Sequence, residues 1–253
     1  TVGPERVVAV SSDNAGNTKV AREIIVETFP WILNLPDPIH HLNLMLKDIA
    51  ALRYFRPTIK RLRGVIKYFK KSGHGKVMLQ KLRLEKELGP GLESIGKTRF
   101  GTLTWSAISL RRSLPAIREL CTSEKVTIPV SYLFSFVIHL LNFVVDQQKW
   151  HNLFLSNTPE TLQFELALGQ FISVTEGGAK AIECLEATAT NPADVFLYWL
   201  AVLAQIKSAL VACCLPDDIC GQIRGIVNSR YREFFVDGPT NVHLSAFYLN
   251  PSK

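Results

Sequence analysis

The stretch Arg6-Val7-Val8-Ala9-Val10-Ser11-Ser12-Asp13 near the start of the chain decides the fold that the sequence predicts. Its first part is apolar and rich in β-branched residues, which is typical of a short buried strand, and Asp13 stands where that strand ends. Residues 19–29 then follow the apolar spacing of a helix, and residues 31–35 are again short and apolar. Strand, helix and strand in this order predict a βαβ unit, with two parallel neighbouring strands and the helix packed across them.

From Asp37 onward the sequence is almost entirely helical in character. Asp37 followed by Pro38 is a favoured helix start, and residues 57–71 repeat apolar side chains along one helix face. Further helices are expected at residues 76–88, 105–121, 158–187, 192–214 and 216–235. The expected fold class is therefore α+β and predominantly α-helical, with a partial βα unit followed by a large all-α region.

Residues 126–145 form a run of twenty residues without a formal charge, which is long enough for a transmembrane helix. A proline and several polar side chains dilute the run, and no second span is evident. A buried helix in an α-helical domain is the favoured interpretation, and no membrane partner is expected.

Charge is distributed unevenly along the 253-residue chain, whose net charge is +7. Residues 53–112 contain 16 Lys and Arg against three acidic residues, whereas the rest of the chain has an acidic excess. Such a concentration of positive charge is typical of a surface that binds a polyanion such as nucleic acid. The other interpretation is a solvated helical face that pairs with the acidic remainder of the same protein.

The five cysteines include no Cys-x-x-Cys pair, and no histidine lies near the group at 213–220. This spacing argues against a zinc site. An odd number of cysteines without a recognisable secretory signal is typical of reduced intracellular thiols, and buried cysteines that act as small apolar residues are the simplest account.

Four short elements occur in a fixed order along the chain. They are the strand that ends at Asp13-Asn14, the helix start Asp37-Pro38-Ile39-His40-His41-Leu42-Asn43-Leu44, the tripeptide Thr98-Arg99-Phe100, and His243-Leu244-Ser245-Ala246-Phe247-Tyr248-Leu249-Asn250-Pro251. In this order they resemble the ribonuclease H-like core of hAT-family transposases, which carries an α-helical insertion. The resemblance implies a partial ribonuclease H-like βα unit at 1–52, an α-helical insertion domain at 53–240 and a return segment towards the core at 241–253.

The resemblance gives Asp13 the middle position of a three-carboxylate catalytic set. In the family these acids bind two divalent metal ions, which activate the attacking oxygen and stabilise the leaving oxygen at phosphorus. No residue matches the first Asp or the final Glu, so the chain is expected to be truncated at both ends and inactive by itself. Mg²⁺ is expected for the full-length family, with Asp13 as a metal ligand only in a complete protein, and no cofactor is expected for this chain alone. The alternative role of Asp13 is that of a turn former or helix cap.

Asp37 and His40 match the (Cys/Asp)-x-x-His element of the family, which implies a structural brace beside the active site. They stand one helical turn apart, so the carboxylate could orient the imidazole. A helix cap next to a half-buried histidine is an equally good account.

Arg99 and Phe100 match the position where the family uses Arg-Trp to grip DNA near the cleavage site. An aromatic ring can stack on an extruded base while Arg holds the phosphate, and the alternative is an aromatic ring that enters the helical core. The basic helices would add phosphate contacts, which give salt-dependent affinity without sequence specificity. The DNA-binding residues expected there are Lys60, Arg61, Arg63, Lys67, Lys70 and Lys71.

The resemblance thus implies a hAT transposase-like or transposase-derived fragment, ancestrally active in Mg²⁺-dependent DNA cleavage and strand transfer. The alternatives are a domesticated, non-enzymatic module that binds DNA or protein in the nucleus, and an unrelated all-α scaffold in which the motifs are accidental. DNA bound without sequence preference is the expected partner, a homo-oligomer is left open, and the expected location is the nucleus.

Overall fold

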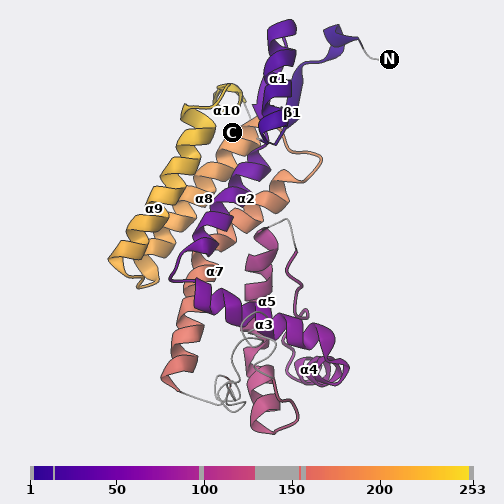
Figure 1. The fold of residues 1–253 in the computed structure, drawn as a ribbon, viewed down its shortest axis with the longest axis vertical. Coiled ribbons are helices and arrows are strands. Elements are labelled where there is room, and N and C mark those ends of the chain that lie inside the picture. The colour runs from indigo at the N-terminus through magenta and orange to yellow at the C-terminus, as the bar shows by residue number, and fades with distance from the viewer. Residues whose placement is uncertain (1–2, 14, 97–99, 129–153, 155–157, 251–253) are drawn as a thin grey trace, which may run out of the picture. The chain divides into compact units, whose positions relative to one another are not determined.

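A small parallel sheet forms near the N-terminus, where the sequence predicts it. In the computed structural model, β1 (Ala9–Ser12) pairs in parallel with β2 (Leu33–Pro36), and Ala9 lies opposite Leu33. The helix α1 (Gly16–Thr28) connects the two strands and packs on both of them (Figure 1). The predicted βαβ unit is therefore confirmed.

The structure describes residues 3–13, 15–96, 100–128, 154 and 158–250. This part of the chain is predominantly helical with one small sheet, which confirms the predicted fold class. The described helices are η1 (Pro4–Arg6), α1, α2 (Pro38–Ala51), α3 (Arg56–Lys71), α4 (Gly73–Glu85), α5 (Gly101–Thr122), α7 (Pro159–Leu185), α8 (Pro192–Ala212), α9 (Asp217–Tyr231), η3 (Arg232–Val236) and α10 (Val242–Leu249). Two compact units divide the chain: unit 1 is Thr1–Ile49 with Gly177–Lys253, and unit 2 is Ala50–Glu176.

The sheet is less buried than the sequence predicts. None of the residues of β1 is buried, and Val8 just before it is 71% exposed. Parallel strands are normally buried because helices cover both faces of their sheet. Here two strands and α1 leave apolar side chains at the surface, among them Ile24 and Trp31. The prediction of a buried first strand is therefore wrong for the described chain, and the strand begins at Ala9, after the short helix η1.

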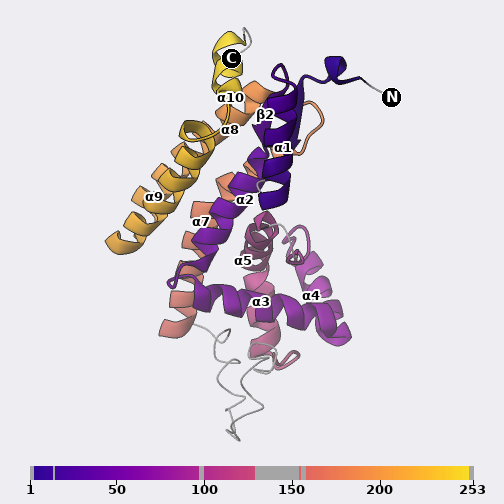
Figure 2. The same ribbon diagram turned by 45° about the horizontal axis from the view of Figure 1, so that its top comes forward.

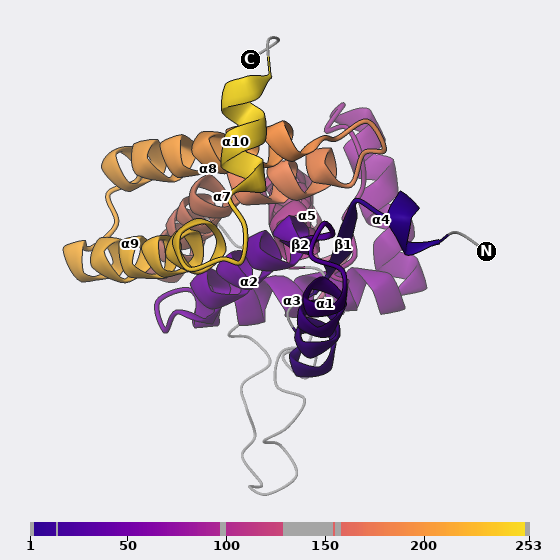
Figure 3. The same ribbon diagram turned by 90° about the horizontal axis from the view of Figure 1, so that it is seen from above.

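An aromatic cluster joins α2, α8, η3 and α10 within unit 1. Trp199 of α8 is fully buried and stacks on Phe234 of η3, with the ring centroids 5.9 Å apart. His243 of α10 and His41 of α2 also lie against Phe234, at centroid distances of 5.3 and 4.9 Å. The helix α9 continues directly into η3, and α10 lies across α8 (Figures 1 and 3). The cluster gives unit 1 a core built largely of rings.

Unit 2 is built around α3, α4, α5 and the first part of α7. The helix α3 crosses α5, and α4 adjoins the C-terminal end of α3 (Figure 2). Phe55, which precedes α3, meets Phe171 of α7 at a centroid distance of 5.5 Å. The Thr104 hydroxyl of α5 donates to the Thr175 hydroxyl of α7 over 3.0 Å. The predicted apolar face of α3 is confirmed, because its buried side chains include Ile59, Leu62, Ile66 and Phe69.

The division into units differs from the predicted domains at the second boundary. The break between Ile49 and Ala50 lies close to the predicted end of the βα unit at residue 52. Residues 177–240, expected in the insertion domain, instead belong to the same unit as the sheet. The physical reason is the aromatic cluster, which connects α2 to α8 and η3. Residues 241–250 lie in unit 1, where α10 packs on α8, and their role as a return segment towards a ribonuclease H-like core stays a prediction.

Most of the uncharged run at 126–145 lies outside the described residues, so the helix expected there stays a prediction. Within the described part of the chain, α8 is long and apolar enough to cross a membrane, by length and composition only. Core helices of soluble proteins meet the same criterion, and Trp199 of α8 lies in the aromatic cluster. The expected absence of a membrane partner therefore also stays a prediction.

Candidate nucleic-acid interface and the Asp13 region

Asp13 lies directly after β1, and its side chain is exposed. Its Oδ1 accepts a hydrogen bond of 2.6 Å from the Thr18 hydroxyl and one of 3.3 Å from the backbone N–H of Ala15. These two bonds, the Thr18 hydroxyl first, lower the pKa of the Asp13 carboxyl, and the positive charges of His40 and Arg22 lower it further. The carboxylate therefore closes the turn that leads into α1, which is the cap role open to it from the sequence.

Arg22 of α1 is the buried cation of this region, with 2% of its surface exposed. Its guanidinium donates to the Ser12 and Asp13 carbonyls and to Oδ1 of Asn34 on β2, at 2.9, 2.5 and 2.9 Å. It also donates to the Ser12 hydroxyl. These bonds tie the C-terminal end of β1 and Asn34 of β2 to α1. The only sequence signal for this role is the spacing of one helical turn between Thr18 and Arg22.

The described residues around Asp13 do not fit a two-metal site. Within the described part of the chain, no group of three or more His, Cys, Asp or Glu could hold a metal ion. Oδ1 of Asp13 already accepts two hydrogen bonds, and a guanidinium donates to the carbonyl of the same residue. Two divalent ions need several carboxylate ligands, and Asp13 alone does not supply them.

Asp37 caps its helix, and the brace with His40 that the resemblance implies stays a prediction. Oδ1 of Asp37 accepts from the backbone N–H of Ile39 over 2.8 Å, which caps α2, and no hydrogen bond joins Asp37 to His40 among the described residues. His40 is half-buried and contributes its charge at Asp13. The neighbouring His41 is buried, and burial lowers its pKa to about 4. The helix-cap interpretation of Asp37 is therefore the one that the geometry supports.

The six basic residues expected on α3 all keep surface exposure. Lys60, Arg63, Lys70 and Lys71 are exposed, whereas Arg61 and Lys67 are half-buried. The stretch from Ile49 to Leu84 contains eleven Lys and Arg and no Asp or Glu. Among the described residues, Arg63, Lys67, Lys70 and Lys71 form no ion pair. The helix thus has an apolar face in the core of unit 2 and a cationic face at its surface.

The element expected to grip DNA is described only in part. Phe100 is half-buried and stands immediately before the first residue of α5, whereas Arg99 lies outside the described residues. A half-buried ring at a helix start fits both interpretations of Phe100, stacking on a base and packing on the core. Both therefore stay open.

Comparisons with protein-family models, with curated proteins and with solved structures find no match to this chain.

Proposed function

We propose that the chain is part of a hAT transposase or of a protein derived from one, and that α3 binds the phosphate backbone of DNA without sequence preference. The observation that carries the proposal is the cationic face of α3, which lies in a stretch of chain free of acidic residues. DNA cleavage and strand transfer are proposed only for a complete protein that supplies further carboxylates around Asp13.

The spacing of the cations supports contact with a continuous polyanion. Lys60, Arg63, Lys67 and Lys71 recur at intervals of three or four residues, so they share one side of α3. At a rise of 1.5 Å per residue, Lys60 and Lys71 are about 16 Å apart along the helix axis. Duplex DNA carries one charge for about every 1.7 Å of its axis, so a face of this length reaches several phosphates.

The surface of the βαβ unit supports the transposase part of the proposal. Val8, Ile24 and Trp31 are each more than half exposed. A parallel sheet of two strands is only marginally stable by itself. A larger sheet with its own helices would cover the apolar side chains that are exposed here. A ribonuclease H-like core, as the resemblance implies, would supply such cover.

A non-enzymatic, domesticated module is the second candidate. The observation that favours it is the state of the Asp13 carboxylate, which caps its own turn beside the guanidinium of Arg22. A carboxylate used in this way serves the fold without a metal ion. In this candidate α3 binds DNA or an acidic protein surface, and no cleavage follows.

The test measures DNA binding by a variant in which three lysines of α3 are changed to glutamate. Lys60, Lys67 and Lys71 changed together to Glu should weaken binding of a fluorescent duplex about tenfold or more at low salt, equally for unrelated sequences. The matched control reverses three exposed lysines elsewhere, Lys47, Lys125 and Lys207.

Anisotropy at two salt concentrations separates the outcomes. The wild-type chain should lose affinity steeply with salt, and the α3 triple variant should show a shallower salt dependence because fewer phosphates are neutralised. Equal losses for the two triple variants would move the site away from α3. A chain that does not bind DNA at low salt would overturn the proposal.

A further inference from the structure

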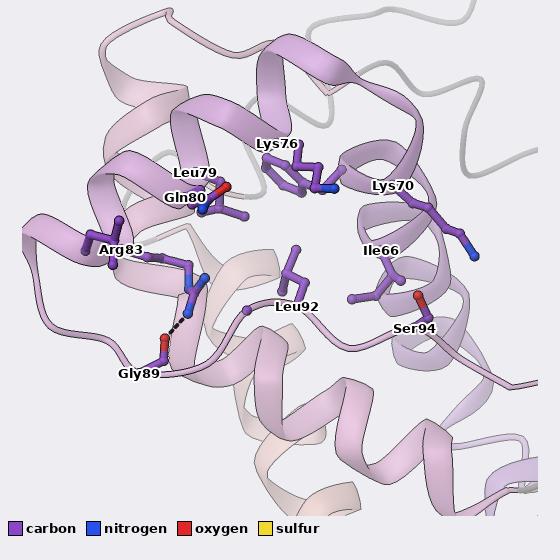
Figure 4. Close-up of a pocket in the computed structure, with 12 residues that line it drawn as sticks. Ile66, Lys70, Lys76, Leu79, Gln80, Arg83, Gly89, Leu92 and Ser94 are labelled. Carbon is purple, nitrogen blue, oxygen red and sulfur yellow. Dashed lines mark hydrogen bonds between the residues drawn. The ribbon is translucent and has the colours of Figure 1, made fainter.

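A groove opens on unit 2 between α3, α4 and the segment that follows α4. Its volume is about 540 Å³. Carbon surface comes from Ile66, Leu79 and Leu92, and the cations of the lining are Lys70, Lys76 and Arg83. Figure 4 shows Arg83 at one end of the groove and Lys70 at the other, with Leu92 between them. The lining contains no acidic residue.

The wall formed by residues 89–94 is fixed in place at both ends. After α4 the backbone N–H of Leu88 donates to the Arg83 carbonyl over 3.1 Å, and Gly89 then adopts a positive φ of 72°. A positive φ suits glycine because it has no Cβ, so the chain can reverse over the end of α4. Side chains of α5 then hold the segment: Ser109 accepts from the Glu93 N–H, Ser106 donates to the Glu93 carbonyl, and Arg112 donates to the Pro90 carbonyl.

Arg83 is a buried cation without a counter-ion in the described part of the chain. It is 9% exposed, its guanidinium donates to the Gly89 carbonyl, and its Nε has no hydrogen-bond partner among the described residues. Burial, and then the like charge of Arg112, lower its pKa. A buried charge without an opposite charge is unfavourable, so a bound anion would stabilise this arrangement.

We propose that the groove binds a small organic phosphate, a phosphoryl group carried on an apolar body of about nucleotide size. The guanidinium fork of Arg83 suits a phosphoryl group of two negative charges at one end of the groove, and the ammonium groups of Lys70 and Lys76 add positive charge elsewhere on the lining. The carbon surface of Leu79 and Leu92 suits the body of the ligand, and Gln80 and Ser94 provide polar groups at the lining. The volume lies within the range of small-ligand pockets and is too small for a duplex.

This ligand goes beyond the proposed DNA contact, and Lys70 is the one cation that the groove shares with the residues expected to bind DNA. The triple reversal on α3 described above changes none of the three cations of the groove. Binding of a small phosphate and binding of DNA can therefore fail or succeed independently.

The test is calorimetric titration of the full chain with ADP, using a matched pair of variants on α4. Lys76 and Lys81 are both exposed lysines of this helix, but Lys76 alone lines the groove. Lys76→Gln should weaken ADP binding about fivefold or more, whereas Lys81→Gln should change it by less than about twofold. Arg83→Gln should weaken it further, and the circular dichroism of that variant shows whether unit 2 remains folded. Equal losses for Lys76→Gln and Lys81→Gln would overturn the proposal, as would no binding of ADP.

Related compounds test the two halves of the proposed ligand, its phosphoryl group and its apolar body, separately. ADP should bind more tightly than pyrophosphate and more tightly than adenosine, because each of these lacks one of the two halves. Dodecyl phosphate that binds as tightly as ADP would support an organic phosphate with an alkyl body instead of a nucleoside. Pyrophosphate as tight as ADP would overturn the role of the apolar body, and adenosine as tight as ADP would overturn that of the phosphate.

Discussion

Asp13 and the cations of α3 differ in what surrounds their charges. The Asp13 carboxylate accepts hydrogen bonds from its own turn, and Arg22 beside it donates to backbone carbonyls and to Asn34. Arg63 and Lys71 on α3 face solvent in a stretch without acidic residues. The difference teaches that the polar groups around Asp13 are already bonded within the fold, whereas the cations of α3 stay at the surface, where the proposed DNA contact would use them.

Among the variants considered for the Asp13 region, a substitution of Arg22 is expected to have the largest effect on stability. Arg22→Met should lower the free energy of unfolding by about 2–4 kcal/mol, because the Ser12 and Asp13 carbonyls and the Asn34 side chain lose a donor that is itself buried. Chemical denaturation monitored by circular dichroism measures it. The control is Arg224→Met, which removes an exposed guanidinium from α9 and should cost less than about 0.5 kcal/mol. If Arg22→Met is as mild as the control, the region is not held as the hydrogen bonds indicate.

The same variant sharpens the comparison when DNA binding is measured. Because α3 lies in the other compact unit, Arg22→Met should keep the salt-dependent DNA affinity of the wild-type chain. Loss of affinity in a folded Arg22→Met chain would show that the sheet region contributes directly to the interface.

His41 gives the next largest effect, and it depends on pH. Burial lowers its pKa to about 4, below the value of about 6.5 for an unfolded chain. The unfolded state therefore binds the proton more readily, and stability falls as the pH drops from 6.5 towards 4. The loss expected from His41 between pH 7.5 and pH 5 is about 2 kcal/mol.

The difference between the wild-type chain and His41→Leu isolates this effect. Urea denaturation at several pH values between 7.5 and 5 should show that the free energy of unfolding of His41→Leu depends less steeply on pH than that of the wild-type chain. Part of the dependence should remain, since burial also lowers the pKa of His243. The control His74→Leu changes an exposed histidine and should leave the slope as it is. An unchanged slope in His41→Leu would show that His41 is not the group whose protonation opposes folding.

Local patterns made the elements predictable. The apolar runs around α1 fix two strands and a helix, and the spacing of Ile59, Leu62 and Ile66 fixes both faces of α3 at once. The cationic face of α3 could be predicted too, because an apolar periodicity that buries one side of a helix leaves the other side exposed. These features need no knowledge of distant residues.

Burial and contacts over long sequence distances could not be predicted in the same way. The exposure of Val8 depends on which elements cover the sheet, and the placement of α8 with α2 depends on rings that meet across the chain, such as His41 and Phe234. The groove is of the same kind, because it exists only where the segment after Gly89 returns along α5.

The role of Asp13 could not be decided from sequence for a different reason. A cap and a metal ligand use the same carboxylate oxygen at the end of the same strand. Which role prevails depends on the neighbours that a fold brings to it, and here these are Thr18, Arg22 and His40.

The variant Asp13→Ala has the smallest expected effect on stability. The direction of its effect on DNA affinity tests whether the Asp13 region and α3 act separately. Its pKa is lowered, first by the Thr18 hydroxyl, so the ionised form stabilises the fold above the ordinary pKa of an aspartate and this contribution disappears as the pH falls through the lowered value. Asp13→Ala should therefore lower the melting temperature slightly at pH 7 and not at pH 2.5, and calorimetric scans at both pH values measure it. Because the side chain is fully solvated, the change should be smaller than that of Arg22→Met. Affinity for DNA should stay the same or rise slightly, since a negative charge is removed without loss of any cation of α3. A large fall in DNA affinity in Asp13→Ala would instead mean that the carboxylate acts at the interface, and the contrast between the two regions would no longer hold.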